Sequence, residues 1–194
     1  MKVSLLGPVE VRSDEGTAID LGGARLRTLL IRLAVDPDQV VGFDALVDAV
    51  WGDEPPANAA NALQQLVSRL RKAGIPIESA PSGYALRVPR NDVDLFNGDA
   101  AAKPWRGPAL AEAADQPWAV AHIARATEQR LAAQEVSTDD VSELEAIVAA
   151  NPLRERPVAQ LMHALVREGR QAEALNVYER HRRLLADEIG RAHV

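Results

Sequence analysis

The chain of 194 residues contains no cysteine, which excludes disulfide bonds and metal sites built from thiolates. No apolar run approaches the roughly 18 residues that a helix needs to span a bilayer. Apolar residues make up 47% and charged residues 26% of the chain, a balance typical of globular domains. These features predict a cytoplasmic protein that buries a core and stays out of the membrane.

The signatures of common enzyme sites are missing as well. None of the four histidines has a second ligand at a spacing typical of zinc sites. No phosphate-binding loop, nucleophile elbow or zinc-protease motif occurs. The sequence therefore gives no indication of an enzyme, and it predicts neither a cofactor nor a bound metal ion.

Positive charge is scarce overall but is gathered in one place. The net charge is −6, which by itself argues against binding to nucleic acid. Residues 36–54 contain six acidic residues and no basic one, whereas residues 57–72 contain three basic residues and no acidic one. Residues 57–72 thus form a basic stripe in a protein that is acidic overall.

The first half of the chain has the pattern of a small α+β domain. Alternating, β-branched segments predict strands over 2–6, 8–12 and 17–21, and two extended segments around Gly83 predict a hairpin over 75–88. Apolar residues spaced by three and four predict three helices, with Phe43 on the inward face of the second. These helices are expected over residues 24–35, 43–51 and 58–73.

The second half is expected to be helical. A polar, alanine-rich stretch over 91–104 predicts a linker. Beyond it, helices joined by short turns favour an α-hairpin repeat. The helices are expected over residues 116–135, 139–150, 154–168 and 171–188.

Specific motifs resemble those of the Streptomyces antibiotic regulatory protein family, also called the AfsR/DnrI/RedD family. The resemblance covers nearly the whole chain. The motifs of the first half lie at 5–11, 21–30, 50–56, 61–72, 83–86 and 93–95, and those of the second at 105–110, 151–156 and 169–175.

The resemblance implies an OmpR/PhoB-type winged helix-turn-helix over 1–96 and a tetratricopeptide-like bacterial transcriptional activator domain over 97–194. The implied function is transcriptional activation, often of secondary-metabolite gene clusters. Double-stranded DNA with direct repeats and RNA polymerase with its sigma factor are the implied partners, and a homodimer on DNA is compatible with them. Such a protein would work in the cytoplasm, at the nucleoid.

Three departures from the family pattern affect the second domain. Phe96-Asn97-Gly98 interrupts the linker helix, residues 134–140 form a shorter connection than usual, and the chain ends at 189–194, where the family continues into another helix. We therefore expect a shortened activator domain.

The helix over 58–73 combines an apolar stripe with a polar face, as a DNA-reading helix requires. Amides pair well with adenine, and cations release counterions from phosphate. The predicted base contacts are Asn61, Gln64 and Gln65. The predicted phosphate contacts are Ser68, Arg69, Arg71 and Lys72, with Arg25 and Arg27 from the first helix and Arg87 from the wing.

The loop over 52–57 carries Asp53 and Glu54 and is stiffened by Pro55-Pro56. In the fold that the resemblance implies, this loop commonly touches RNA polymerase, and its two carboxylates suit a basic sigma-factor surface. A solvated loop explains the same residues. Trp51, just before it, is expected to belong to the core.

Two alternatives stay open on the sequence alone. The chain could be a protein-interaction module with a degenerate winged helix, which the net charge of −6 favours. It could also bind DNA without activating transcription, because the shortened helical domain would not recruit polymerase.

Overall fold

The computed structural model describes residues 1–96 and 105–191, which form two compact units. The first unit is Met1–Gln129 and the second is Arg130–Val194. Helix α4 (Val120–Ser137) begins in the first unit and ends in the second. The domain boundary at residue 96 remains a prediction. The boundary between the two compact units lies later in the chain, between Gln129 and Arg130.

The chain opens with two short antiparallel strands, β1 (Lys2–Ser4) and β2 (Glu10–Arg12). Their central valines, Val3 and Val11, lie opposite each other and are buried. The third predicted strand, over 17–21, is wrong: a single bridge joins Ala18 to Arg12.

Three helices follow, α1 (Ala24–Ala34), α2 (Phe43–Trp51) and α3 (Ala59–Lys72), close to their predicted bounds. Helix α1 is the centre of the core, because Leu29, Leu30 and Leu33 are fully buried. Phe43 was expected to point inward but is 37% exposed. It begins α2, where its ring lies nearly perpendicular to the Tyr84 ring, with the two ring centres 5.5 Å apart.

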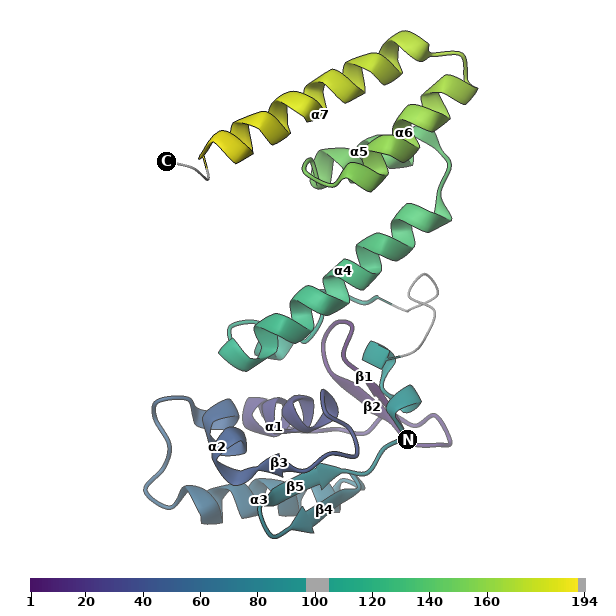
Figure 1. Ribbon diagram of the computed structural model, residues 1–194. Helices are drawn as coiled ribbons and strands as arrows, with labels where there is room; N and C mark the ends of the chain where they lie inside the picture. Colours follow the sequence, from purple (N-terminus) through teal and green to yellow (C-terminus); the bar gives the residue numbers. More distant parts are fainter. Residues whose placement is uncertain (97–104, 192–194) are drawn as a thin grey trace. The chain divides into compact units, whose positions relative to one another are not determined.

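A three-stranded antiparallel sheet completes this arrangement (Figure 1). Strands β4 (Ile77–Ala80) and β5 (Gly83–Leu86) form the predicted hairpin. The two-residue strand β3 (Val41–Gly42), which was not predicted, pairs with β5 and places β5 in the centre. A Cβ atom on Gly83 would lie 1.9 Å from the carbonyl oxygen of Val41, so this position requires glycine. Helices α1–α3 with this hairpin make a winged helix.

Residues after the wing belong to the same core. Short 3-10 turns η1 (Arg90–Asp92) and η2 (Asp94–Phe96) occupy the start of the predicted linker, and Val93 is fully buried. The rest of that prediction, 97–104, lies outside the described residues. Turns η3 (Ala111–Ala113) and η4 (Pro117–Ala119) lead into α4. Leu110 and Ala126 are buried in the cluster that contains α1.

The second unit contains α5 (Val141–Ala150), α6 (Glu155–Arg167) and α7 (Gln171–Arg191). Helix α6 packs against both α5 and α7. The Asp140 carboxylate caps α5 by accepting a hydrogen bond from the Glu143 N–H at 3.0 Å. The buried cluster of this unit is small: Val141, Leu144, Leu161, Ala164, Leu165 and Ala174.

No helix within residues 1–96 and 105–191 is both long enough and apolar enough to cross a membrane.

Candidate nucleic-acid interface

Helix α3 is built as a strongly two-sided helix. The Asn58 side chain caps it by accepting a hydrogen bond from the backbone N–H of Asn61 at 3.0 Å. Leu63, Val67 and Leu70 bury its inner face. Its last turn carries Arg69, Arg71 and Lys72, where positive charge is favoured by the helix dipole.

The outer face of α3 is open to solvent. Six predicted contacts lie here, and all six residues are exposed: Asn61, Gln64, Gln65, Ser68, Arg69 and Lys72. Their side chains make no hydrogen bond or ion pair with any other residue that the structure describes. Donors and cations are therefore displayed on this face without an internal role, as a nucleic-acid surface requires.

Arg71 differs from its neighbours because it is tied to the hairpin. Its Nε donates to the carbonyl oxygen of Ile77 at 2.8 Å, and its Nη2 donates to Ser79 Oγ at 2.8 Å. The guanidinium carbon lies 5.9 Å from the centre of the Tyr84 ring. Arg71 thus joins the end of α3 to the wing, whatever contact it makes with phosphate.

Arg87 is also engaged within the protein. Its Nε donates to Glu78 Oε2 at 2.6 Å, and its Nη1 donates to the carbonyl oxygen of Asp38 at 2.9 Å. The hydrogen bond from Arg87 lowers the pKa of Glu78 below its ordinary value. Arg87, a predicted phosphate contact, is therefore paired with a carboxylate inside the protein.

The two arginines at the start of α1 face different neighbours. Arg25 and Arg69 together line two shallow hollows of about 400 and 220 Å³, so Arg25 extends the surface of α3. Arg27 lies 4.0 Å from Glu112, with nitrogen Nη1 facing oxygen Oε1. The structure brings Arg25 to the predicted DNA surface and turns Arg27 toward η3.

The loop between α2 and α3 projects both carboxylates. Asp53 and Glu54 are exposed, and their carboxylates make no ion pair within the described residues. The backbone N–H of Glu54 donates to the carbonyl oxygen of Trp51. Trp51 packs against the core, which confirms its predicted place. The geometry leaves Asp53 and Glu54 available to a partner.

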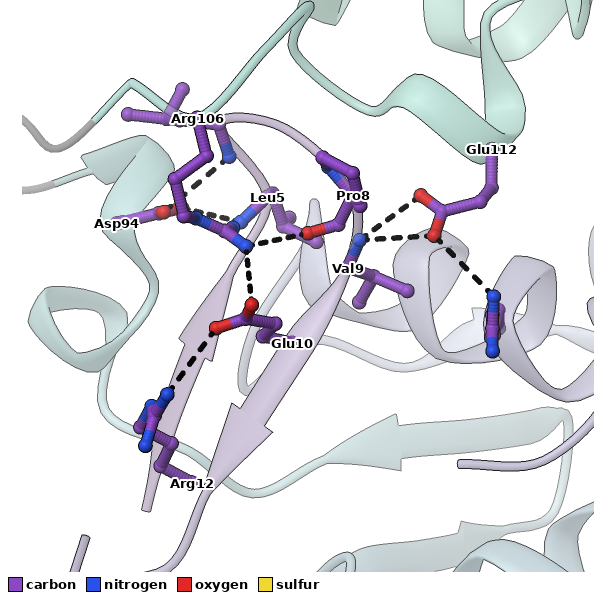
Figure 2. A network of polar contacts seen from close by, with 10 residues as sticks. Leu5, Pro8, Val9, Glu10, Arg12, Asp94, Arg106 and Glu112 are labelled. Atoms are coloured by element: carbon purple, nitrogen blue, oxygen red, sulfur yellow. Dashed lines mark hydrogen bonds and ion pairs between the residues drawn. The ribbon is translucent and has the colours of Figure 1, made fainter. Parts of the chain in front are cut away.

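The sequence reasoning missed the polar contacts that hold the Leu5–Glu10 loop, which Figure 2 shows. The single N–H of Val9 is shared between the two carboxylate oxygens of Glu112, at 3.0 and 3.1 Å. Arg106 donates to the Pro8 carbonyl oxygen at 2.8 Å and lies 3.2 Å from Glu10.

The buried Asp94 carboxylate accepts the Leu5 N–H at 2.6 Å in the same network (Figure 2). Gly7 allows the close approach, because a Cβ atom there would lie 2.9 Å from Arg106 Cβ. The only signal in the sequence was the Gly7-Pro8 break, which does not identify partners about 100 residues away.

Two family models match this chain. "Transcriptional regulatory protein, C terminal" matches residues 16–81, and "Bacterial transcriptional activator domain" matches residues 95–193. The first match contains α1–α3 and strand β4, and it ends before strand β5. The second covers the helical part together with the segment that holds the Leu5–Glu10 loop.

Named relatives cover almost all of the chain. Transcriptional regulator RedD of Streptomyces coelicolor is 34% identical over 98% of this chain and 66% of its own length. Regulatory protein AfsR of the same organism is 37% identical over 98% of this chain and 23% of its own length. The chain thus spans from about a quarter to about two thirds of these relatives.

A solved structure agrees with the fold. Mycobacterium tuberculosis EmbR, determined in complex with a low affinity phosphopeptide, matches with a TM-score of 0.81 and 31% identity, over 97% of this chain and 60% of that one. The family models, the relatives and this structure agree with the motif resemblance. The chain belongs to the Streptomyces antibiotic regulatory protein family of transcriptional regulators.

Proposed function

We propose that this chain is a sequence-specific DNA-binding regulator that activates transcription. The observation that carries the proposal is the outer face of α3, where amides and cations are exposed and have no partner within the described chain. A helix of this kind enters the major groove, while the hairpin behind it reaches the DNA backbone. This surface supports DNA binding in spite of the net charge of −6.

The contacts divide by chemistry. Base edges are proposed for the amides Asn61, Gln64 and Gln65, because amides make paired hydrogen bonds to adenine. Two groups of residues are proposed to contact DNA phosphate. Most of the phosphate binding is assigned to Ser68, Arg69, Lys72 and Arg25. A smaller part is assigned to Arg27, Arg71 and Arg87, because each of these already has a partner in the protein.

Activation is proposed to run through the α2–α3 loop. Asp53 and Glu54 are exposed beside the reading helix and offer negative charge to a basic surface of RNA polymerase or its sigma factor. The family resemblance supports direct repeats as the operator, a homodimer on DNA and genes of a secondary-metabolite cluster as targets. The site of action is then the nucleoid, in the cytoplasm, and no catalytic activity is assigned.

The test is binding of the full chain to the duplex upstream of its own gene, measured by fluorescence anisotropy at about 50 and 200 mM salt. A scrambled duplex of equal length is the reference. We expect tighter binding to the upstream duplex and steep salt dependence. Arg69→Ala with Lys72→Ala should lower the salt slope by about two.

The control variant is Arg180→Ala with Arg183→Ala on α7, which changes the net charge equally. It should leave the slope unchanged. Equal affinity for both duplexes, with no effect of the α3 variant, would instead favour the protein-interaction module. Specific binding without increased transcription by purified polymerase would favour a regulator that does not activate.

A further inference from the structure

The second unit contains a groove that DNA binding does not explain. Helices α5, α6 and α7 line it, and its volume is about 440 Å³ (Figure 1 locates the helices). Sites for small molecules fall in the same size range and have mainly apolar walls. The larger apolar residues of the lining are Val148, Val158, Leu161, Leu165, Val177 and Leu184.

One buried polar group stands out in this lining. The His181 side chain is 9% exposed, and its Nδ1 lies 3.0 Å from the carbonyl oxygen of Pro152. Both residues line the groove. A carbonyl oxygen only accepts hydrogen bonds, so Nδ1 must carry the proton, and in the neutral ring Nε2 is left as an acceptor.

That acceptor has no partner. Nε2 of His181 is buried, and no described residue donates a hydrogen bond to it. An unsatisfied buried acceptor is costly, and native proteins rarely leave one without a function, a water or a ligand. The lining also contains Glu145 and Glu173, whose carboxylates only accept hydrogen bonds. It contains Asn176 and Arg180 as well, and neither donates to Nε2.

We propose that the groove binds an apolar small molecule that carries one O–H or N–H donor, which hydrogen-bonds Nε2 of His181. The apolar walls receive the body of the molecule, and the imidazole selects for the donor. Since Nε2 is buried, a lining side chain must shift before the molecule can reach it. This site goes beyond DNA binding and does not depend on it.

Indole and 1-methylindole are suitable probes, because they share a ring system and differ in the single N–H donor. Binding to the full chain is followed by NMR, from the backbone amides of Leu161 and Val177 and from the imidazole nitrogens of His181. We expect indole to shift these resonances and to bind about tenfold tighter than 1-methylindole, as one hydrogen bond to an otherwise unsatisfied acceptor allows.

His181→Phe keeps a ring and removes Nε2, so it should abolish the preference for indole. His163→Phe is the matched control, because His163 is exposed on α6 and does not line the groove. It should leave the preference intact. The wild-type comparison needs no variant and decides the matter even if His181→Phe fails to fold.

Equal binding of the two probes to the wild-type chain would overturn the proposal. So would shifts confined to residues outside the groove, or the absence of any shift at millimolar indole. A preference for indole that survives in His181→Phe would likewise refute the role of Nε2.

Discussion

The outer face of α3 and the junction between α3 and the hairpin both carry basic side chains. Those on the outer face have no hydrogen-bond partner among the described residues, whereas those at the junction do. On the outer face, Arg69 and Lys72 are exposed and make no hydrogen bond or ion pair with another described residue. At the junction, Arg71 donates to a backbone carbonyl and a hydroxyl, and Arg87 pairs with Glu78. A run of basic residues in a sequence can therefore contain both side chains that are free to bind DNA and side chains that hold the fold together. Only their hydrogen-bond partners in the structure distinguish the two.

The largest effect is expected where the hairpin is tightest. In Gly83→Ala, the new Cβ would meet the Val41 carbonyl at 1.9 Å, and neither backbone can move without breaking the sheet. We expect the free energy of unfolding to fall by about 3 kcal/mol or more. Urea unfolding followed by circular dichroism measures it.

Gly107→Ala is the control for this substitution, because its Cβ would make only ordinary contacts at 3.6 Å. It should change the unfolding free energy by less than about 1 kcal/mol. If Gly83→Ala lowers the unfolding free energy equally little, β3 and β5 can move apart more easily than their geometry indicates.

Gln64→Ala tests the outer face. Loss of a paired hydrogen bond to a base should reduce discrimination between the operator and a scrambled duplex by about 1–3 kcal/mol, with little change in non-specific affinity. Anisotropy titrations with both duplexes give this difference. An equal loss of affinity on both duplexes would make Gln64 a positioning residue.

Arg71→Ala and Arg69→Ala sharpen the comparison directly. Arg71→Ala should lower the free energy of unfolding by about 1–2 kcal/mol because two hydrogen bonds to the hairpin are lost. Arg69→Ala should leave stability within about 0.5 kcal/mol but lower the salt slope of DNA binding by about one. If Arg71→Ala lowers the slope as much as Arg69→Ala, Arg71 contacts phosphate as well.

The local sequence pattern was sufficient to predict the helices and the hairpin, because apolar spacing and turn residues act over a few positions. It did not predict features that depend on contacts between residues far apart in the chain. Strand β3 has two residues and exists only because β5 lies beside it. The contact of Arg27 with Glu112 and the hold of Arg106 on Pro8 join residues far apart in the chain. No periodicity encodes such pairs, so the sequence predicted which residues could bind DNA but not which were already engaged.

The smallest effect on affinity, and the most informative one, is expected in the α2–α3 loop. Asp53→Lys with Glu54→Lys removes negative charge next to the reading helix, so operator affinity should stay equal or rise. Transcription from the target promoter should fall, because the charge offered to polymerase is reversed. The two acids are exposed and unpaired within the described residues, so the substitution should not disturb the fold.

Both quantities are measured on one preparation, with anisotropy for operator affinity and purified polymerase for transcript yield. Asp115→Lys with Glu155→Lys, at two exposed positions, is a control that changes the charge equally outside this loop. A fall in yield at full occupancy, absent from the control, separates the loop from the DNA-reading face. Yield that follows occupancy in every variant would mean that the loop only solvates its carboxylates, and the activating surface would then lie elsewhere on the chain.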